Sequence, residues 1–406
     1  MNIALLHYAA PPVVGGVETV LGQHARLLAE DGFEVCIIAG RGGQVDERIK
    51  FVAVPEMDSR NPEVLSIKTE LDAGRVPARF ESLVIRIEAQ LNELLNGTDR
   101  VILHNVCSLN KNLALTAALH HISKDMTAAR FILWHHDLAW TTPRYRSELH
   151  DGNPWDLLRT DWPWVEQVVV SEQRRRELSE LMALPASRIH VIPNGLDIER
   201  FLKLEAETSE LQHRLKLSEA APLILLPVRI TPRKNIELAL RVVAALRRDF
   251  TQCRLLVTGP LGPHNAANRQ YFELLMRLRV ELQIQDHVHF LAEIVDHAIP
   301  DPVIADLYKL ADVLILPSRE EGFGIPLLEA GLVGLPIFCS DIEALREVGG
   351  LNVHYFSPDA EPSKIAAEIG KLLASSQTFG LRKRVLQSYS WDRIYRNSIV
   401  PLLTKG

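Results

Sequence analysis

Two glutamates eight residues apart, Glu321 and Glu329, could bind a ligand or take part in catalysis through their carboxylates. The apolar run 311–316 before them predicts a buried strand. Pro326 predicts the first turn of a helix, because its missing N–H is not needed there. Glu321 would then lie in a loop with two glycines, and Glu329 about one turn into the helix. Ligands of α/β proteins bind at such a corner, and the free N–H groups of a helix start attract anions.

Two basic residues, Arg229 and Lys234, occupy a similar corner earlier in the chain. They follow an apolar stretch, 223–228, that predicts a strand. A helix is predicted over 236–249, with Asn235 as its N-cap. A guanidinium and an ammonium group beside a helix start suit a phosphate. The alternative interpretation is a set of solvated surface bases, but the placement at the rim of a crevice favours the phosphate.

Two adjacent histidines, His135 and His136, follow the predicted strand 131–134. A side chain at the carboxyl end of a parallel strand points toward the crevice where ligands bind. Because neighbouring residues of an extended chain point to opposite faces, at least one of the two should face that crevice. They do not form a zinc motif, since no third ligand has suitable spacing.

A glycine pair, Gly15 and Gly16, lies between the predicted strand 3–7 and the predicted helix 18–29. Without Cβ atoms, the pair would let a ligand approach the backbone closely. The alternative is a plain tight turn before a helix. The pair does not belong to a GxGxxG sequence, so nothing supports a nicotinamide site.

An irregular stretch, 139–164, holds four of the six tryptophans of the chain together with tyrosine and arginine. Trp140, Arg144 and Tyr145 in this stretch suit stacking and hydrogen bonding with a sugar ring. The aromatic side chains would equally suit a hydrophobic brace under a long loop. The pattern leaves both interpretations open.

Composition and charge limit the functional classes. The formal net charge of −6 argues against nucleic acid as the main partner. The first 195 residues hold 20 basic and 25 acidic side chains, which does not favour docking on an anionic membrane, although one local patch could still bind it. The four cysteines are far apart, which indicates reduced thiols and a cytoplasmic protein. Residues 1–6 look like a strand rather than a signal peptide, and no apolar run approaches the ~18 residues of a membrane span.

Strand and helix patterns alternate along the chain in two successive series. This alternation predicts an α/β protein with two doubly wound parallel sheets. A polar stretch separates the series, so the domain change is expected near 195–220. The length of 406 residues agrees with two domains.

Together these segments resemble the retaining GT-B glycosyltransferases of the glycosyltransferase family 4, group 1 type. The resemblance covers nearly the whole chain, and its most specific part is 321–329, which looks like the family's E-x7-E motif. The supporting segments follow in the family's order: 15–18, His136-Asp137, 192–197, Arg229 with Lys234, 312–318, and Tyr389-Ser390-Trp391 before a last helix. One departure is visible. The family often has Gly after the phosphate-binding Lys, whereas this chain has Asn235, which a helix cap would explain.

The resemblance implies a GT-B architecture, in which two Rossmann-like doubly wound domains face a central cleft. Residues 1–200 would bind the acceptor and residues 201–385 the nucleotide-sugar donor. Residues 386–406 would form a helix that crosses back to the N-terminal domain. The donor would be of the UDP-glucose or GDP-mannose type, and the acceptor hydroxyl would belong to a small molecule or a saccharide. Transfer would retain the configuration of the sugar.

The expected site residues fall into three groups. Catalysis is assigned to His136, Glu321, Arg229 and Lys234. Donor binding is assigned to Gly15, Gly16, Arg229, Lys234, Glu321, Gly322, Phe323, Gly324, Ile325 and Glu329. Acceptor binding is assigned to His135, Trp140, Arg144 and Tyr145. Glu321 would contact the hydroxyls of the donor sugar, Glu329 those of the ribose, and His136 the sugar or its leaving-group side.

Negative charge grows on the pyrophosphate during sugar transfer and has to be stabilised. The sequence contains no DxD pair to hold a metal ion, so Arg229 and Lys234 are expected to take the place of a metal. No cofactor is expected. No side chain is a convincing covalent nucleophile. The acceptor would therefore attack on the face from which the leaving group departs, and a β-phosphate oxygen would accept its proton.

Three alternatives remain at this point. The two glutamates could be the acid and the nucleophile of a glycosidase, but one of them is tied to a helix start that prefers anions. A GT-B-like epimerase acting on a nucleotide sugar would share the architecture. A non-catalytic sugar-nucleotide-binding protein would share it too, although every expected charged residue is present.

Overall fold

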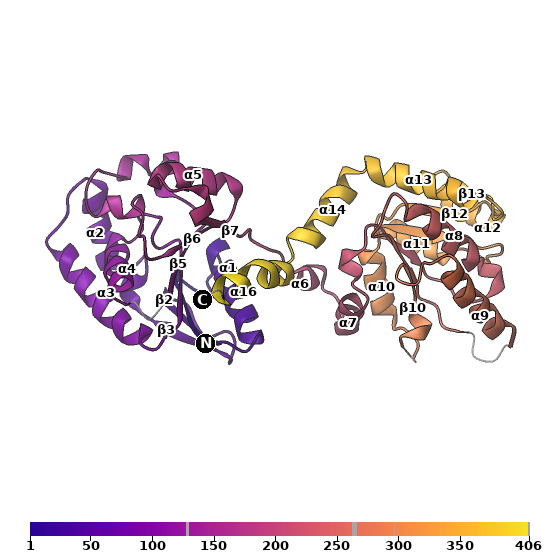
Figure 1. The fold of residues 1–406 in the computed structure, drawn as a ribbon, viewed down its shortest axis with the longest axis horizontal. Coiled ribbons are helices and arrows are strands. Elements are labelled where there is room, and N and C mark those ends of the chain that lie inside the picture. Colours follow the sequence, from indigo (N-terminus) through magenta and orange to yellow (C-terminus); the bar gives the residue numbers. More distant parts are fainter. Residues whose placement is uncertain (127–129, 262–265, 296, 405–406) are drawn as a thin grey trace. The chain divides into compact units, whose positions relative to one another are not determined.

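The computed structural model describes residues 1–126, 130–261, 266–295 and 297–404. The chain forms two compact units. The N-terminal unit comprises Met1–Gly195 together with Trp391–Gly406, and the C-terminal unit comprises Leu196–Ser390. The last two residues of the predicted C-terminal segment, 405 and 406, lie outside the described residues. Each unit is described by itself below (Figure 1).

The N-terminal unit is built on a seven-stranded sheet in which all neighbouring strands are parallel. The strand order is β3-β2-β1-β4-β5-β6-β7. The strands are β1 (Asn2–Ala9), β2 (Glu34–Arg41), β3 (Ile49–Ala53), β4 (Arg100–His104), β5 (Arg130–His135), β6 (Glu166–Val169) and β7 (Ile189–Val191). The central strands are buried on both faces, which is why β1 and β4 read as continuous apolar runs.

Helices cover both faces of this sheet. The main ones are α1 (Gly16–Glu30), α2 (Pro62–Asp72), α3 (Arg79–Leu95), α4 (Leu113–Asp125) and α5 (Glu172–Met182). Ala4 and Leu6 of β1 pack in the core with α3 and α4, whereas Ile3 and Leu5 pack in the core with α1. Figure 1 shows α3 and α4 on one side of the sheet and α1 with α16 on the other.

The C-terminal end of the chain returns to the N-terminal unit. It forms α15 (Trp391–Ile394), a π-helical turn (Tyr395–Ile399) and α16 (Val400–Thr404). Trp391 packs against Gly195, where a Cβ atom would lie 2.7 Å from the indole ring. Arg100 donates to the carbonyl oxygen of Leu403 (3.0 Å), and the Tyr395 hydroxyl donates to Asp31 (3.0 Å). These contacts fix the returning helix to the first domain.

The C-terminal unit is built on a second parallel sheet, with the strand order β10-β9-β8-β11-β12-β13. The strands are β8 (Leu223–Leu226), β9 (Arg254–Val257), β10 (Val288–Phe290), β11 (Val313–Leu316), β12 (Ile337–Ser340) and β13 (His354–Phe356). The helices are α6 (Ile198–Leu202), α7 (Ala206–Arg214), α8 (Ile236–Leu246), α9 (Ala266–Glu281), α10 (Asp301–Leu310), α11 (Ile325–Leu332), α12 (Glu343–Gly349), α13 (Pro362–Ser375) and α14 (Gln377–Ser388).

In each sheet the chain starts at a central strand, builds outward on one side, and then continues on the other side of that strand. The expected α/β fold with two doubly wound parallel sheets is therefore confirmed. The reversal lies between β1 and β4 in the first sheet and between β8 and β11 in the second. Ligands of doubly wound proteins bind at the carboxyl ends of the strands at such a switch point. No helix among the described residues is long and apolar enough to cross a membrane.

Candidate active site

The switch point of the second sheet carries a buried ion pair. Lys234 follows β8 and Glu321 follows β11, and the Lys234 Nζ atom lies 2.5 Å from Glu321 Oε1. The Ser318 hydroxyl donates to the same oxygen at 2.7 Å. The side chains of Lys234 and Glu321 are only 10% and 9% exposed. Glu321 Oε2 makes no hydrogen bond with any described residue, so it can still accept one from a ligand.

Asn235 locks the loop after β8 in place, but it does so differently from the expected helix cap. The side chain makes no capping bond, so the cap prediction is wrong. Instead, the amide nitrogen donates to the carbonyl oxygens of Pro317 (3.1 Å) and Pro358 (2.9 Å). The backbone is left-handed (φ 52°), a conformation that Gly adopts freely and Asn tolerates. This explains why Asn stands where the family often has Gly.

The start of α8 is capped by another residue. The Tyr271 hydroxyl of α9 accepts the N–H of Ile236 at 2.9 Å and donates to Glu237. The loops after β8 and β11 are joined further by the N–H of Arg319, which donates to the carbonyl oxygen of Arg233 at 2.8 Å. The two loops that carry the ion pair are therefore held together by main-chain as well as side-chain bonds.

Of the two glycines in the loop before α11, only Gly324 is required by the backbone and its surroundings. Gly324 has a φ of +107°, and a Cβ atom there would lie 2.7 Å from Leu345. Gly322 is exposed, with no atom near the position of its missing Cβ. No side chain caps the helix. Pro326 has no N–H, and the Leu327 N–H donates to the carbonyl oxygen of Gly324 at 2.9 Å, so the N–H of Ile325 is the one in the first turn left for an anion among the described residues. The side chains of Phe323 and Ile325 are 52% and 59% exposed and stay outside the core.

Glu329 of α11 is held by a residue that sequence reasoning missed. The hydroxyl of Tyr308 in α10 donates to Glu329 Oε2 at 2.5 Å. Burial raises the pKa of Tyr308, and the nearby Glu329 carboxylate raises it further, so the phenol stays protonated. Glu329 Oε1 has no donor among the described residues. No local pattern links the two positions, since they lie on consecutive helices on either side of β11.

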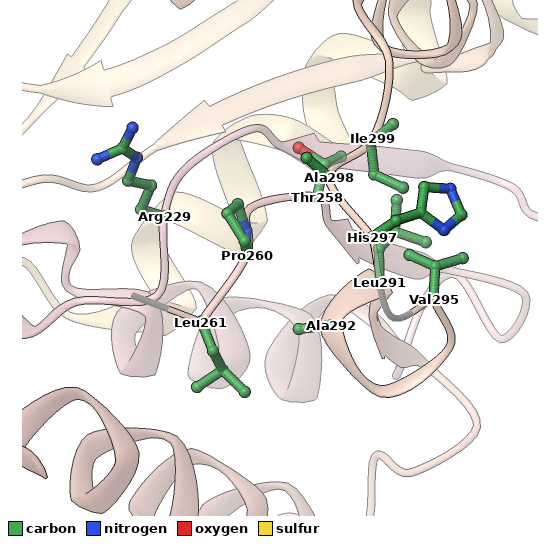
Figure 2. Close-up of a pocket in the computed structure, with 10 residues that line it drawn as sticks. All are labelled: Arg229, Thr258, Pro260, Leu261, Leu291, Ala292, Val295, His297, Ala298 and Ile299. Atoms are coloured by element: carbon green, nitrogen blue, oxygen red, sulfur yellow. The ribbon is translucent and has the colours of Figure 1, made fainter. Parts of the chain in front are cut away.

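A pocket lies beside this corner, at the carboxyl ends of β8, β9 and β10 (Figure 2). Its volume is ≈ 580 Å³. It is lined by Arg229, Thr258, Pro260, Leu261, Leu291, Ala292, Val295, His297, Ala298 and Ile299. Figure 2 shows Arg229 at one edge of this group. Arg229 is exposed and pairs with no acidic side chain among the described residues. The sequence prediction did not include the loops after β9 and β10.

The glycine pair of the N-terminal unit lies at the start of α1, as placed by the sequence pattern. Gly15 is extended (φ −176°), so no left-handed backbone requires glycine there. A Cβ atom on Gly15 would clash with the Glu18 carboxylate, while one on Gly16 would meet nothing within 4 Å. The helix start has no side-chain cap. Ligand binding by the pair stays a prediction.

The two adjacent histidines point to different partners. His135 is 1% exposed, and its Nε2 atom lies 2.8 Å from the side-chain oxygen of Gln167 on β6. It is buried in the core, and its assignment to the acceptor stays a prediction. His136 is 9% exposed, and its Nε2 atom lies 3.1 Å from His104 Nδ1. Burial lowers the pKa of His135 to about 4 and that of His136 to about 3, so both are neutral at pH 7.

Tryptophan side chains of the stretch 139–164 pack inside the N-terminal unit and support this loop. Trp155 and Trp162 are buried in the core. The Trp140 indole donates to the carbonyl oxygen of Trp155 at 3.3 Å, and the Arg159 guanidinium covers its ring at 3.9 Å. The Arg159 guanidinium thus occupies one face of the Trp140 ring, and the role of Trp140 in acceptor binding stays a prediction.

The other two residues expected to bind the acceptor lie side by side. The guanidinium of Arg144 lies 4.7 Å from the ring centre of Tyr145. Arg144 is exposed and Tyr145 is half-buried. Their role in acceptor binding stays a prediction. Across the described parts of both units, no group of three or more His, Cys, Asp or Glu side chains is placed to hold a metal ion.

Comparison with known proteins assigns both halves of the chain. Residues 14–200 match the sequence model described as Glycosyltransferase Family 4, and residues 207–387 match the one described as Glycosyl transferases group 1. The chain is 26% identical over 440 residues to the MMP alpha-(1->4)-mannosyltransferase of Mycolicibacterium hassiacum, with 98% of this chain and 97% of that protein covered.

Two further proteins are similar along most of their length. The mannosylglucosylglycerate synthase of Thermotoga maritima is 26% identical over 375 residues, which cover 85% of this chain and 82% of that protein. The match to a glycosyltransferase structure from Rickettsia africae covers 100% of this chain and 99% of that chain, at 16% identity and a TM-score of 0.37. Because the two matched segments together span nearly the whole sequence, the chain belongs to the group 1 glycosyltransferases, with a family 4 N-terminal half, and is a glycosyltransferase.

Proposed function

We propose that this glycosyltransferase moves a hexose from a nucleotide-diphosphate sugar to a hydroxyl of a small-molecule or saccharide acceptor, with retention and without a metal ion. The observation that carries the proposal is the corner formed by Arg229, Lys234 and Glu321 at the switch point of the second sheet. It combines a guanidinium that pairs with no described acidic side chain, a buried ammonium group, and a carboxylate with one oxygen that no described residue binds. That set suits a diphosphate next to a sugar ring.

The cations would stabilise the leaving nucleoside diphosphate. Lys234 uses one of its three N–H donors in the hydrogen bond to Glu321, so two remain for phosphate oxygens. Arg229 can bind two phosphate oxygens at once. The N–H of Ile325 and the positive end of the α11 dipole add partial positive charge. Because these groups are held before the substrate arrives, they would stabilise the developing charge at little cost in reorganisation.

The carboxylates would hold the hydroxyl groups of the donor substrate. Glu321 Oε1 is fixed by Lys234 and Ser318, which leaves Oε2 to accept from a hydroxyl of the sugar. Glu329 is fixed by Tyr308 and keeps Oε1 for the ribose. The pocket beside Arg229 would hold the base, since its volume of ≈ 580 Å³ and its mostly apolar lining are typical of small-ligand sites.

Of the two donor types that fit, the names of the whole-length relatives favour the mannosyl donor. Both the Mycolicibacterium hassiacum and the Thermotoga maritima proteins carry mannose in their names. The acceptor would bind the N-terminal unit. The proposed location is the cytoplasm, which agrees with four cysteines that are all free thiols.

The transfer would proceed in one chemical step. The acceptor oxygen forms a bond to the anomeric carbon while the bond from that carbon to the β-phosphate oxygen breaks. The hydroxyl proton of the acceptor goes to a β-phosphate oxygen on the same face of the sugar. A glycosyl-enzyme intermediate trapped on His136 or Glu321 would overturn this step.

The test is a donor screen on the full-length protein, with UDP-, GDP- and ADP-sugars, with and without EDTA and with mixed acceptors. We expect release of free nucleotide and a glycosylated acceptor from one donor, unchanged by EDTA. Formation of an epimer without acceptor would favour the epimerase alternative. Donor binding without any turnover would favour the non-catalytic alternative, and loss of activity in EDTA would contradict metal independence.

A further inference from the structure

We propose that His104 and Asn105, at the end of β4, are positioning residues that hold His136 as a hydrogen-bond donor to the substrate. In this arrangement the Nδ1 atom of His136 carries the proton and faces the ligand, and Nε2 faces the protein. The inference rests on the proposed function in one respect, which is that His136 contacts the substrate. The tautomer itself can be measured in the free protein.

The first observation is the contact between the two imidazole rings. His104 Nδ1 lies 3.1 Å from His136 Nε2, and the ring centres are 5.5 Å apart. His104 is completely buried and His136 is 9% exposed. Burial lowers the pKa of His136 to about 3 and that of His104 well below its usual value, so neither ring is charged at pH 7. One ring must therefore donate and the other accept.

The direction of this hydrogen bond follows from the other nitrogen of His104. His104 Nε2 is buried and has no hydrogen-bond partner among the described residues. If His136 donated, His104 would have to carry its proton on Nε2, which would leave a buried N–H without an acceptor. If His104 donates from Nδ1, only a lone pair is left without a partner. The second arrangement avoids the orphaned donor and puts the proton of His136 on Nδ1.

The second observation is the backbone of Asn105. This residue has a left-handed conformation (φ 59°), which is uncommon for residues other than glycine. Its side-chain oxygen accepts the N–H of His136 at 2.6 Å and that of Asp137 at 3.1 Å. Its own N–H donates to the carbonyl oxygen of Trp134 at 2.9 Å. The end of β4 thus fixes the backbone at His136 as well as its ring.

These contacts decide what His136 can do chemically. Nε2 is occupied by His104, and Nδ1 bonds to no described residue. A neutral imidazole with its proton on Nδ1 donates a hydrogen bond to a hydroxyl or phosphate oxygen and does not act as a base through that atom. This agrees with a transfer in which a phosphate oxygen takes the acceptor proton.

The test combines nuclear magnetic resonance with three substitutions. Two-bond ¹H–¹⁵N correlation spectra of the histidine rings report which nitrogen carries the proton, and His136→Gln assigns the signals. We expect wild-type His136 to be protonated on Nδ1. His104→Leu removes the donor at a similar volume, so the ¹⁵N signal of His136 Nε2 should move to the position of an acceptor nitrogen without a hydrogen bond. His104→Asn keeps an amide N–H near the position of Nδ1 and should restore the wild-type signal.

The kinetic readout separates positioning from folding. His104→Leu should lower kcat by about tenfold or more with a smaller change in KM, since a misplaced donor loses transition-state contacts. His104→Asn should recover activity to within a few-fold. Asn105→Gly keeps the left-handed backbone but loses the acceptor oxygen, so it should lower kcat, whereas Asn105→Asp should keep more of it.

Two results would overturn the inference. One is a wild-type spectrum with the proton of His136 on Nε2, which needs no variant to fold. The other is an unchanged His136 signal and kcat in folded His104→Leu. Full activity of His136→Gln would be a different failure, because it would remove the proposed role of His136 in transfer and leave the measured tautomer as it is.

Discussion

Replacing Lys234 by Met is expected to lower kcat by about 100- to 1,000-fold, the usual effect of removing one fixed group that stabilises transition-state charge. Methionine keeps the length and apolar stem of lysine but loses the ammonium group. The diphosphate would then leave without its buried cation. Steady-state kinetics with the best donor of the screen measures the change.

The same substitution should also destabilise the C-terminal unit. It leaves the Glu321 carboxylate buried with only Ser318 as a partner, and breaking a buried ion pair in this way typically costs about 3–5 kcal/mol. Adding Glu321→Gln to Lys234→Met removes the uncompensated charge. The double variant should therefore recover much of the lost melting temperature but none of the activity. A stable double variant with wild-type kcat would show that the pair has only a structural role.

Replacing Glu329 by Ala is expected to weaken binding of the nucleotide about 10- to 100-fold, because hydrogen bonds to a charged group contribute about 1.5–3 kcal/mol. The loss should appear in the KM of the donor more than in kcat, since the ribose is far from the bond that breaks. Titration with the free nucleoside diphosphate measures the same effect without turnover.

A ribose contact predicts a specific dependence on the ligand. The 2′-deoxynucleotide should bind the wild-type protein more weakly, and Glu329→Ala should bind the two nucleotides about equally. Tyr308→Phe removes the donor that orients Glu329 and should have a smaller effect in the same direction. If Glu329→Ala still prefers the ribonucleotide as strongly as the wild type does, the ribose assignment is wrong.

The sequence predicted the doubly wound sheets because their signals are local. Apolar runs such as 313–316, ended by proline or glycine, mark buried parallel strands whatever surrounds them. The start of α11 was predicted for the same reason, since Pro326 suits a first helical turn. The short edge strand β3 was missed, because Lys50 interrupts its five residues and leaves no long apolar run.

Contacts between distant residues could not be predicted in this way. The sequence placed Lys234 and Glu321 at two strand ends, but nothing local shows that they pair with each other. Asn235 was expected to cap its own helix, yet its amide bonds two loops that lie far along the chain. Trp140 suits stacking on a sugar by residue type, and nothing local shows that the Arg159 guanidinium lies over its ring. The partners of these side chains depend on the packing of distant segments, and residue types alone do not reveal them.

The most direct test of the corner formed by Arg229, Lys234 and Glu321 is calorimetric titration of UDP and GDP into the full-length protein in EDTA. The account predicts that one of the two binds at a ratio of one to one. It also predicts that Arg229→Gln and Lys234→Met each weaken that binding by about tenfold or more, as expected for lost bonds to a charged phosphate. Equal affinity in the wild type and both variants, or binding that appears only with a divalent metal ion, would contradict it.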